Sequence, residues 1–184
     1  MVGLKYEELC GKKDSELEAI FRAGKTPERK NLLGWEFRGY NTPFITQILG
    51  FRKFKKGFFV GPGQTEDGPE VMGFNVLVVQ NGLYGQWLPL PSTTAPQRYG
   101  FYRVYNVRPE EIDNKHSNAL LLNYGIPRNG LNPARLLRDY LVQPNPDNID
   151  LYLGRAYFAL GNMRVFPSFF VLERYNKIEG KIGY

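Results

Sequence analysis

The chain has 184 residues, of which 42% are hydrophobic, and its 24 basic and 18 acidic side chains give a net charge of +6. This length and composition predict a soluble globular protein with one domain over residues 1–184, and its 20 glycines and 13 prolines favour short strands and many turns. The single cysteine, Cys10, excludes an intramolecular disulfide, and with one histidine, His116, too few soft ligands remain for a zinc site of the Cys/His type. We therefore expect no metal. No Gly-x-Gly-x-x-Gly or P-loop pattern occurs, and we expect no cofactor.

No targeting signal is recognisable in the sequence. Residues 1–13 lack the apolar stretch of a secretory signal, and no window approaches the roughly 18 apolar residues of a membrane-spanning helix. Val2 occupies the position that N-myristoylation requires to be glycine. The expected location is the cytoplasm.

Two short helices are predicted near the amino terminus. Ser15 and Glu18 form a capping-box pattern in front of apolar residues at helical spacing, which predicts a helix over residues 15–23. A further helical turn is predicted over residues 42–50, where a proline follows a threonine cap.

Most of the remaining chain has the pattern of β-strands. Residues 33–40 alternate between apolar and polar, which indicates a strand with one buried face. Apolar runs separated by turn residues follow, and Gly161-Asn162 predicts a tight hairpin between the last two. The fold class is therefore mainly β, an antiparallel up-and-down barrel over about residues 33–175, whose seven further strands are predicted over 51–60, 71–80, 83–88, 99–107, 118–124, 151–160 and 164–175.

A third helix is predicted over residues 132–142, packed on the barrel. Asn132 supplies a cap and Pro133 a first helical residue, and Arg135 and Asp139 stand four residues apart as a helical ion pair does.

A leading helix, a tryptophan near the start of the first strand and an aromatic last strand resemble the layout of the calycin group, and of lipocalin-like proteins in particular. In that family the tryptophan packs beneath the barrel against an arginine or lysine near the end of the last strand. The resemblance implies that Trp35 and Arg174 make this contact here, with the cation over the indole ring. In this chain, Gly34 directly precedes the tryptophan, whereas the family's motif has the glycine two residues before it.

Two arginines stand among aromatic residues on predicted strands. Arg103 shares a strand face with Tyr105, and Arg155 shares one with Tyr157. If these faces point into the barrel, the guanidinium groups require a carboxylate, a carbonyl or an anionic ligand. The alternative is the opposite strand parity, in which both arginines face solvent.

The leading functional hypothesis is a binding protein that holds a small, mostly apolar ligand inside the barrel and performs no covalent chemistry. An acidic head group, such as that of a fatty acid, is expected to meet the two arginines. The predicted ligand-binding residues are Trp35, Phe37, Arg103, Tyr105, Arg155, Tyr157 and Phe169.

Two other functions compete with ligand binding. The first is an isomerase or cyclase on the same barrel, which would use those tyrosines or arginines to polarise an oxygen. The second is an interaction module, because the segment Phe51–Phe59 interleaves four cations with four phenylalanines and suits nucleic acid or an anionic membrane. An exposed strand edge protected by lysines has the same pattern.

His116 and Ser117 are adjacent, but neighbouring residues of a strand point to opposite faces, so the pair is poorly placed for proton transfer. A solvated loop histidine explains the position, and Cys10 has no base nearby in the sequence. We therefore predict no catalytic residue.

Overall fold

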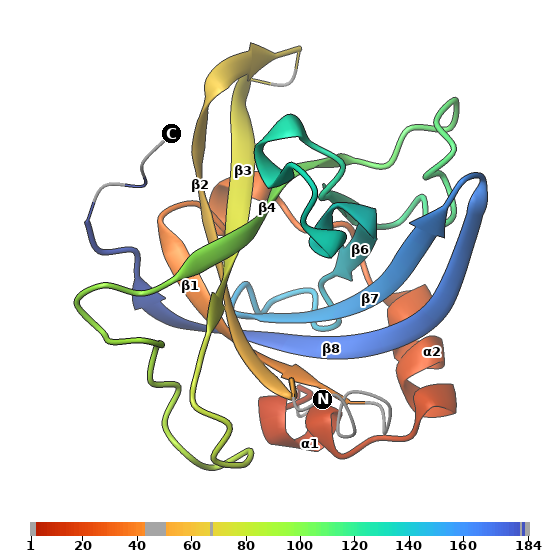
Figure 1. Cartoon of the computed structure of the whole chain (residues 1–184). Coiled ribbons are helices and arrows are strands. Elements are labelled where there is room, and N and C mark those ends of the chain that lie inside the picture. Colours follow the sequence, from red (N-terminus) through yellow and green to blue (C-terminus); the bar gives the residue numbers. More distant parts are fainter. Residues whose placement is uncertain (1–2, 43–50, 67, 181, 183–184) are drawn as a thin grey trace.

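The computed structural model describes residues 3–42, 51–66, 68–180 and 182. Eight antiparallel strands in these residues form a closed barrel in which each strand pairs with its neighbours in the sequence and the last pairs with the first (Figure 1). The predicted fold class is confirmed. The strands are β1 (Trp35–Asn41), β2 (Lys53–Thr65), β3 (Gly68–Leu77), β4 (Arg98–Asn106), β5 (Leu120–Asn123), β6 (Leu137–Val142), β7 (Leu151–Leu160) and β8 (Met163–Lys177).

Two of the predicted elements are wrong. The helix expected over residues 132–142 is a single turn, η3 (Pro133–Leu136), followed by strand β6. Along β6, Leu141 packs in the barrel interior while Tyr140 and Val142 pack outside, so a period of two governs these residues. The strand expected over residues 83–88 is a loop, and an isolated bridge between Val78 and Pro89 follows it.

The helices lie mainly at the amino terminus. The predicted helix over 15–23 is confirmed as α2 (Asp14–Ala23), and its capping contact is made by Glu16 to the backbone of Lys13. A shorter helix that was not predicted, α1 (Tyr6–Cys10), precedes it, and single turns η1 (Arg29–Asn31) and η2 (Pro127–Asn129) complete the set among the described residues. The helical turn expected over residues 42–50 falls, beyond Thr42, outside the residues that the structure describes.

The barrel interior is filled by aromatic side chains that meet across the lumen. Phe37 of β1 contacts Tyr152 of β7, with ring centroids 5.5 Å apart, although β8 separates these strands in the sheet. Glycines on the inner face leave room for large rings on the paired residue: a Cβ atom at Gly154 would overlap the ring of Phe170. The interior is a packed core of interlocking rings.

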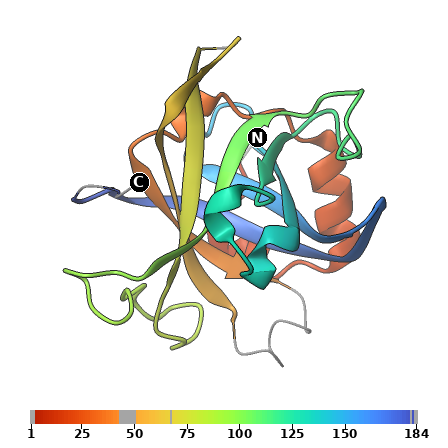
Figure 2. The same cartoon turned by 45° about the horizontal axis from the view of Figure 1, so that its top comes forward.

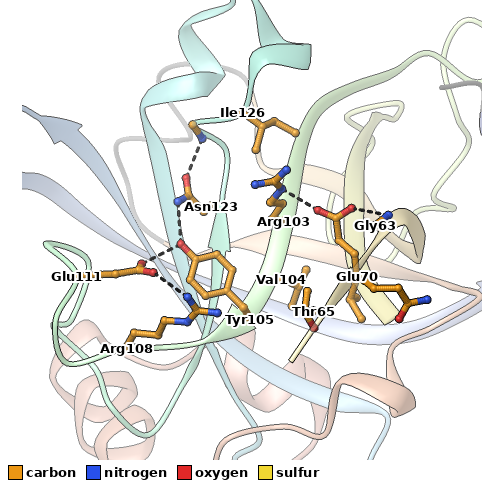
Figure 3. A pocket seen from close by; sticks show the side chains of 13 residues that line it. Gly63, Thr65, Glu70, Arg103, Val104, Tyr105, Arg108, Glu111, Asn123 and Ile126 are labelled. Atoms are coloured by element: carbon orange, nitrogen blue, oxygen red, sulfur yellow. Dashed lines mark hydrogen bonds and ion pairs between the residues drawn. The ribbon is translucent and has the colours of Figure 1, made fainter. Parts of the chain in front are cut away.

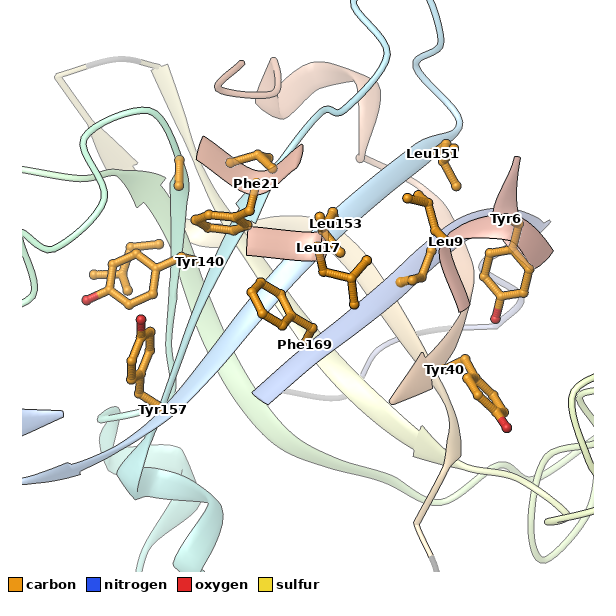
Figure 4. Packing of buried hydrophobic residues seen from close by; sticks show 14 of the residues in the cluster. Tyr6, Leu9, Leu17, Phe21, Tyr40, Tyr140, Leu151, Leu153, Tyr157 and Phe169 are labelled. Atoms are coloured by element: carbon orange, nitrogen blue, oxygen red, sulfur yellow. The ribbon is translucent and has the colours of Figure 1, made fainter. Parts of the chain in front are cut away.

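The outer face of the barrel is also apolar where the helices cover it. Leu17 and Phe21 of α2 pack against Leu153 of β7 and Phe169 of β8, and Leu9 of α1 extends the same cluster (Figure 4). Strands β7 and β8 are therefore buried on both faces, which explains why their sequences do not alternate cleanly between apolar and polar.

Two hairpins project from the barrel. The β2–β3 arm extends from one side, and the β7–β8 hairpin forms a separate edge of the molecule in both views (Figures 1 and 2). The tight turn predicted at Gly161-Asn162 is present, with Leu160 paired to Met163 across it. None of the helices in the described part of the chain is long and apolar enough to cross a membrane.

Candidate functional site

The structure brings Trp35 and Arg174 together. The Arg174 guanidinium lies 4.6 Å from the centroid of the indole ring, and the Lys177 ammonium lies 3.8 Å from it. Arg174 also donates a hydrogen bond to the carbonyl of Asn31 at 2.7 Å, which ties β8 to the segment that precedes β1. This group of residues fixes one end of the barrel.

Arg103 and Arg155 do not share a lumen, so this expectation is wrong. The residues of β4 and β7 that point into the barrel alternate with these arginines along each strand. Tyr102 and Tyr152 are examples, and both belong to the interior cluster. Arg103 has a side chain 58% exposed and pairs with Glu70, whereas Arg155 lies beneath α2 and pairs with Glu18. Each guanidinium thus obtains a carboxylate at the outer surface, which removes the cost of burying it without a partner.

The other predicted ligand residues are divided between the two faces of the barrel. Phe37 is fully buried in the lumen, while Tyr157 and Phe169 pack on the outer face under α2. Tyr105 also points outward, next to Arg103 on β4 (Figure 3). Of the predicted set, Arg103 and Tyr105 line the same concave surface on the barrel wall.

An ion pair crosses the centre of the barrel. Lys56 Nζ lies 2.9 Å from Asp139 Oδ2, and the two residues belong to β2 and β6, which are four places apart in the ring of eight strands. Lys56 also donates hydrogen bonds to Asn75 Oδ1 at 2.9 Å and to the Tyr124 hydroxyl. All three donors of the ammonium are therefore satisfied inside the core.

Aromatic rings surround this ion pair. Lys56 Nζ lies between 5.0 and 5.4 Å from four ring centroids, and its side chain is only 4% exposed. Burial lowers the pKa of Lys56, while the neighbouring Asp139 carboxylate opposes that change. Burial also raises the pKa of Tyr124 well above its usual value, so the phenol stays protonated and donates a hydrogen bond to Asp139.

The basic surface expected from Phe51–Phe59 does not form. Lys53 and Lys55 are buried like Lys56: Lys53 donates to the carbonyl of Gly85 at 2.8 Å, and Lys55 pairs with Glu36 at 3.2 Å. The alternative of a lysine-protected edge also fails, because the closed barrel pairs β2 on both sides.

A groove on the barrel wall is the candidate functional site. It has a volume of about 390 Å³ and lies between the β2–β3 arm, the outer face of β4, the segment after β4 and the residues that follow β5 (Figure 3). Its polar side chains come from Gln64, Thr65, Glu70, Arg103, Tyr105, Arg108, Glu111 and Asn123.

Two arginine–glutamate pairs occupy different parts of the groove. On one side, Arg103 Nε lies 2.7 Å from Glu70 Oε1, and the other oxygen of Glu70 accepts the Gly63 N–H at 3.2 Å. On the other side, the Tyr105 hydroxyl donates to Glu111 at 3.0 Å, with the Arg108 guanidinium 3.9 Å from the same carboxylate (Figure 3). Together, the two arginines and two glutamates of these pairs have no net charge.

Arg103 supplies free hydrogen-bond donors to the groove. Glu70 is largely buried and both of its oxygens are engaged, whereas the terminal nitrogens of Arg103 make no hydrogen bond or ion pair with the described residues. Burial raises the pKa of Tyr105, so its phenol stays protonated at neutral pH. The groove therefore presents a half-exposed guanidinium that is held in place by a carboxylate behind it.

Sequence reasoning missed Glu70, Arg108, Glu111 and Asn123, which lie on three separate segments and carry no motif. It also missed the buried state of Lys56, for which a signal exists. The alternation Phe54, Lys56, Phe58 places this lysine on the same strand face as two phenylalanines.

His116 is only partly solvated. Its Nε2 lies 2.9 Å from the Tyr157 hydroxyl, and the ring packs edge-on against Phe21 of α2 with centroids 5.1 Å apart. Burial, supported by the nearby charge of Arg155, lowers the pKa of His116 to about 4. The neutral histidine thus forms part of the contact between α2 and the barrel, and it lies outside the groove.

Comparison of the chain with protein-family models, with curated proteins and with solved structures finds no match. The closed antiparallel barrel of eight strands is consistent with a calycin-like fold, and membership of that group stays a prediction.

Proposed function

We propose that the protein is a binding protein whose ligand is a small carboxylate with an apolar body, held in the groove on the barrel wall. The observation that carries this proposal is the Arg103 guanidinium, which Glu70 fixes from behind while its terminal N–H groups face the groove. A planar guanidinium with two free parallel donors matches the two oxygens of a carboxylate.

The charge of the groove favours a monoanion. The two arginines and two glutamates of the groove have a net charge of zero. A ligand with one negative charge, placed at Arg103, is therefore attracted by the adjacent guanidinium. A dianion such as a phosphate monoester would bring its second charge close to Glu70 and Glu111 and be repelled. Ile126 lines the groove as well and supplies an apolar surface for the body of the ligand.

The chemistry of the groove favours binding over catalysis. Its lining among the described residues contains neither cysteine nor histidine, and the phenol of Tyr105 is held protonated by burial and by its hydrogen bond to Glu111. These groups can orient a ligand, and in the one hydroxyl–carboxylate pair among them, Tyr105 and Glu111, the proton stays on the phenol.

This site replaces the lumen as the proposed location of an acidic ligand. A ligand inside the barrel would have to displace the Lys56–Asp139 pair and the aromatic rings around it. The groove keeps the acidic head group at Arg103 and the neighbouring Tyr105 and requires no rearrangement of the core.

The test is calorimetric titration with benzoate, and with benzamide as the uncharged analogue of the same shape. We expect benzoate to bind with a dissociation constant on the order of millimolar or tighter, and benzamide to bind at least tenfold more weakly. Arg103→Met should weaken benzoate binding by tenfold or more. Arg155→Met is the matched control, because this arginine is also ion-paired on the outer wall but lies under α2. Equal affinity of the parent protein and Arg103→Met would refute the proposal.

A further inference from the structure

The tip of the β7–β8 hairpin carries an unusual number of exposed apolar side chains. Phe166 is 68% exposed, Met163 is 63% exposed and Leu160 is 45% exposed. Leu160 and Met163 are cross-strand partners at the turn, so their side chains lie on the same face of the hairpin. An exposed apolar cluster on a soluble domain usually marks a surface that contacts a partner.

Phe166 is also held in a backbone conformation that bulky residues rarely adopt. Its φ is 53°, within a bulge where Phe166 and Pro167 together stand opposite Tyr157 on β7. A left-handed conformation at a non-glycine aromatic residue costs on the order of 1 kcal/mol, and strain of this kind concentrates at functional sites. The bulge turns an aromatic ring outward where a regular strand would not.

The surroundings of the hairpin are basic. No acidic residue occurs between Asp150 and Glu173, and the two arginines of this stretch are neutralised by partners on other segments. Lys115 lies beside the hairpin, with its ammonium 5.8 Å from the Tyr157 ring, and makes no ion pair with the described residues. Arg135 is on η3, which packs against β7, and bonds only to a backbone carbonyl there.

We propose that the tip of the β7–β8 hairpin docks the protein on an anionic lipid surface, with Phe166, Met163 and Leu160 inserted at the level of the headgroups. The hairpin forms a projecting edge of the molecule, so its tip can reach a flat lipid surface (Figures 1 and 2). The unpaired cations beside it complement the negative charge of the lipid headgroups. This inference does not depend on ligand binding in the groove.

Vesicle flotation tests the docking surface. The full chain is mixed with phosphatidylcholine vesicles, or with vesicles that contain one quarter phosphatidylglycerol, and the bound fraction is measured against lipid concentration. We expect binding to the anionic vesicles, weakened by salt, and little binding to the neutral ones. The Lys115→Gln/Arg135→Gln double variant should bind the two kinds of vesicle more equally.

The variants separate insertion from folding. Phe166→Asn removes the aromatic ring, and asparagine tolerates the positive φ, so the variant should unfold at the same temperature as the parent or a higher one. We expect it to bind anionic vesicles about tenfold more weakly, because one partly inserted ring is lost. Tyr84→Asn is the matched control, because Tyr84 is 88% exposed and belongs to the loop between β3 and β4. This loop lies on the other side of the molecule from the hairpin (Figure 1).

Three results would overturn the proposal. The first is an absence of binding to either kind of vesicle, and the second is equal loss of binding in Phe166→Asn and Tyr84→Asn. The third is a lipid-independent dimer, detected by sedimentation velocity, that Phe166→Asn abolishes while vesicles bind neither protein. That outcome would assign the hairpin to contacts between two copies of the chain.

Discussion

Replacement of Lys56 by methionine tests the ion pair at the centre of the barrel. Methionine keeps most of the apolar length of lysine, so the main change is the loss of the ammonium that contacts Asp139 at 2.9 Å. Removal of one partner from a buried ion pair leaves a carboxylate without a counter-charge and typically costs about 3–5 kcal/mol. We expect Lys56→Met to lower the free energy of unfolding by about this amount, a large part of the stability of a typical domain.

The second half of this test is the double variant Lys56→Met/Asp139→Leu. With both charges removed, no uncompensated charge remains, and Tyr124 keeps Asn75 as a neighbour in hydrogen-bonding range. Replacement of a buried ion pair by apolar residues is often neutral or stabilising. The double variant should therefore be at least about 2 kcal/mol more stable than Lys56→Met alone, in spite of carrying one more substitution.

Urea unfolding followed by tryptophan fluorescence and by circular dichroism measures these differences. Lys30→Met is the control, since Lys30 pairs with Glu28 at an exposed position where an ion pair contributes little. The single variant Asp139→Leu completes the cycle. The reasoning is refuted if Lys56→Met costs less than about 1 kcal/mol, or if the effects of Lys56→Met and Asp139→Leu simply add in the double variant.

Three further predictions concern packing and pH. Gly154→Ala should destabilise the protein by about 1–3 kcal/mol in urea unfolding, because the added methyl group overlaps the Phe170 ring. Gly11→Ala is the control and should cost less, since Gly11 has a φ of −94° and its Cβ would meet nothing closer than 3.7 Å. Arg174→Ala should cost about 1–3 kcal/mol through the lost contact with Trp35 and the unsatisfied carbonyl of Asn31, and a thermal melt identical to that of the parent would contradict this. The pKa of His116 is lowered to about 4 in the folded protein, so the unfolded chain binds the proton first as the pH falls. The contribution of neutral His116 to the free energy of unfolding is therefore complete above about pH 6.5 and is lost as the pH falls toward 4. His116→Gln should flatten this part of the stability–pH curve.

The strands that alternate or form continuous apolar runs could be predicted from the sequence, but β6 could not. Asn132, Pro133 and the spacing of Arg135 and Asp139 are typical of a helix, and the local pattern contains nothing against it. The partner that places Asp139 on an inner strand face is Lys56, 83 positions away in the sequence. A choice between helix and strand that depends on such a contact cannot be made from a window of ten residues.

The faces of the strands were harder to predict than the strands themselves. Both faces of β7 are apolar, one toward the lumen and one toward α2, so hydrophobicity does not distinguish Tyr152 from Leu153. Arg155 lies on the outer face that α2 covers, and it pairs with a carboxylate of that helix. Its position among apolar residues therefore did not indicate which face of β7 points into the lumen. A shift of one residue in parity exchanges the two faces completely.

The candidate groove depended on contacts that no sequence pattern encodes. Tyr105 and Arg103 could be placed on one strand face, two residues apart, and this part of the prediction agrees with the structure. The residues that hold them, Glu70 and Glu111, come from a neighbouring strand and from the segment that follows β4. The role of Glu70 becomes visible only when the register of β3 against β4 is known, and that of Glu111 only when the segment after β4 is seen to turn back to Tyr105.

The central claim is that the ligand site lies on the barrel wall and not in the lumen, and a ¹H–¹⁵N correlation spectrum recorded during a benzoate titration tests it most directly. Glycine amides mark both locations: Gly63 and Gly125 line the groove, whereas Gly39, Gly73 and Gly154 lie under the aromatic rings of the interior. We predict that the groove glycines show the largest shifts and that Arg103→Met abolishes them. Shifts concentrated at the three interior glycines would contradict the account and return the ligand to the lumen.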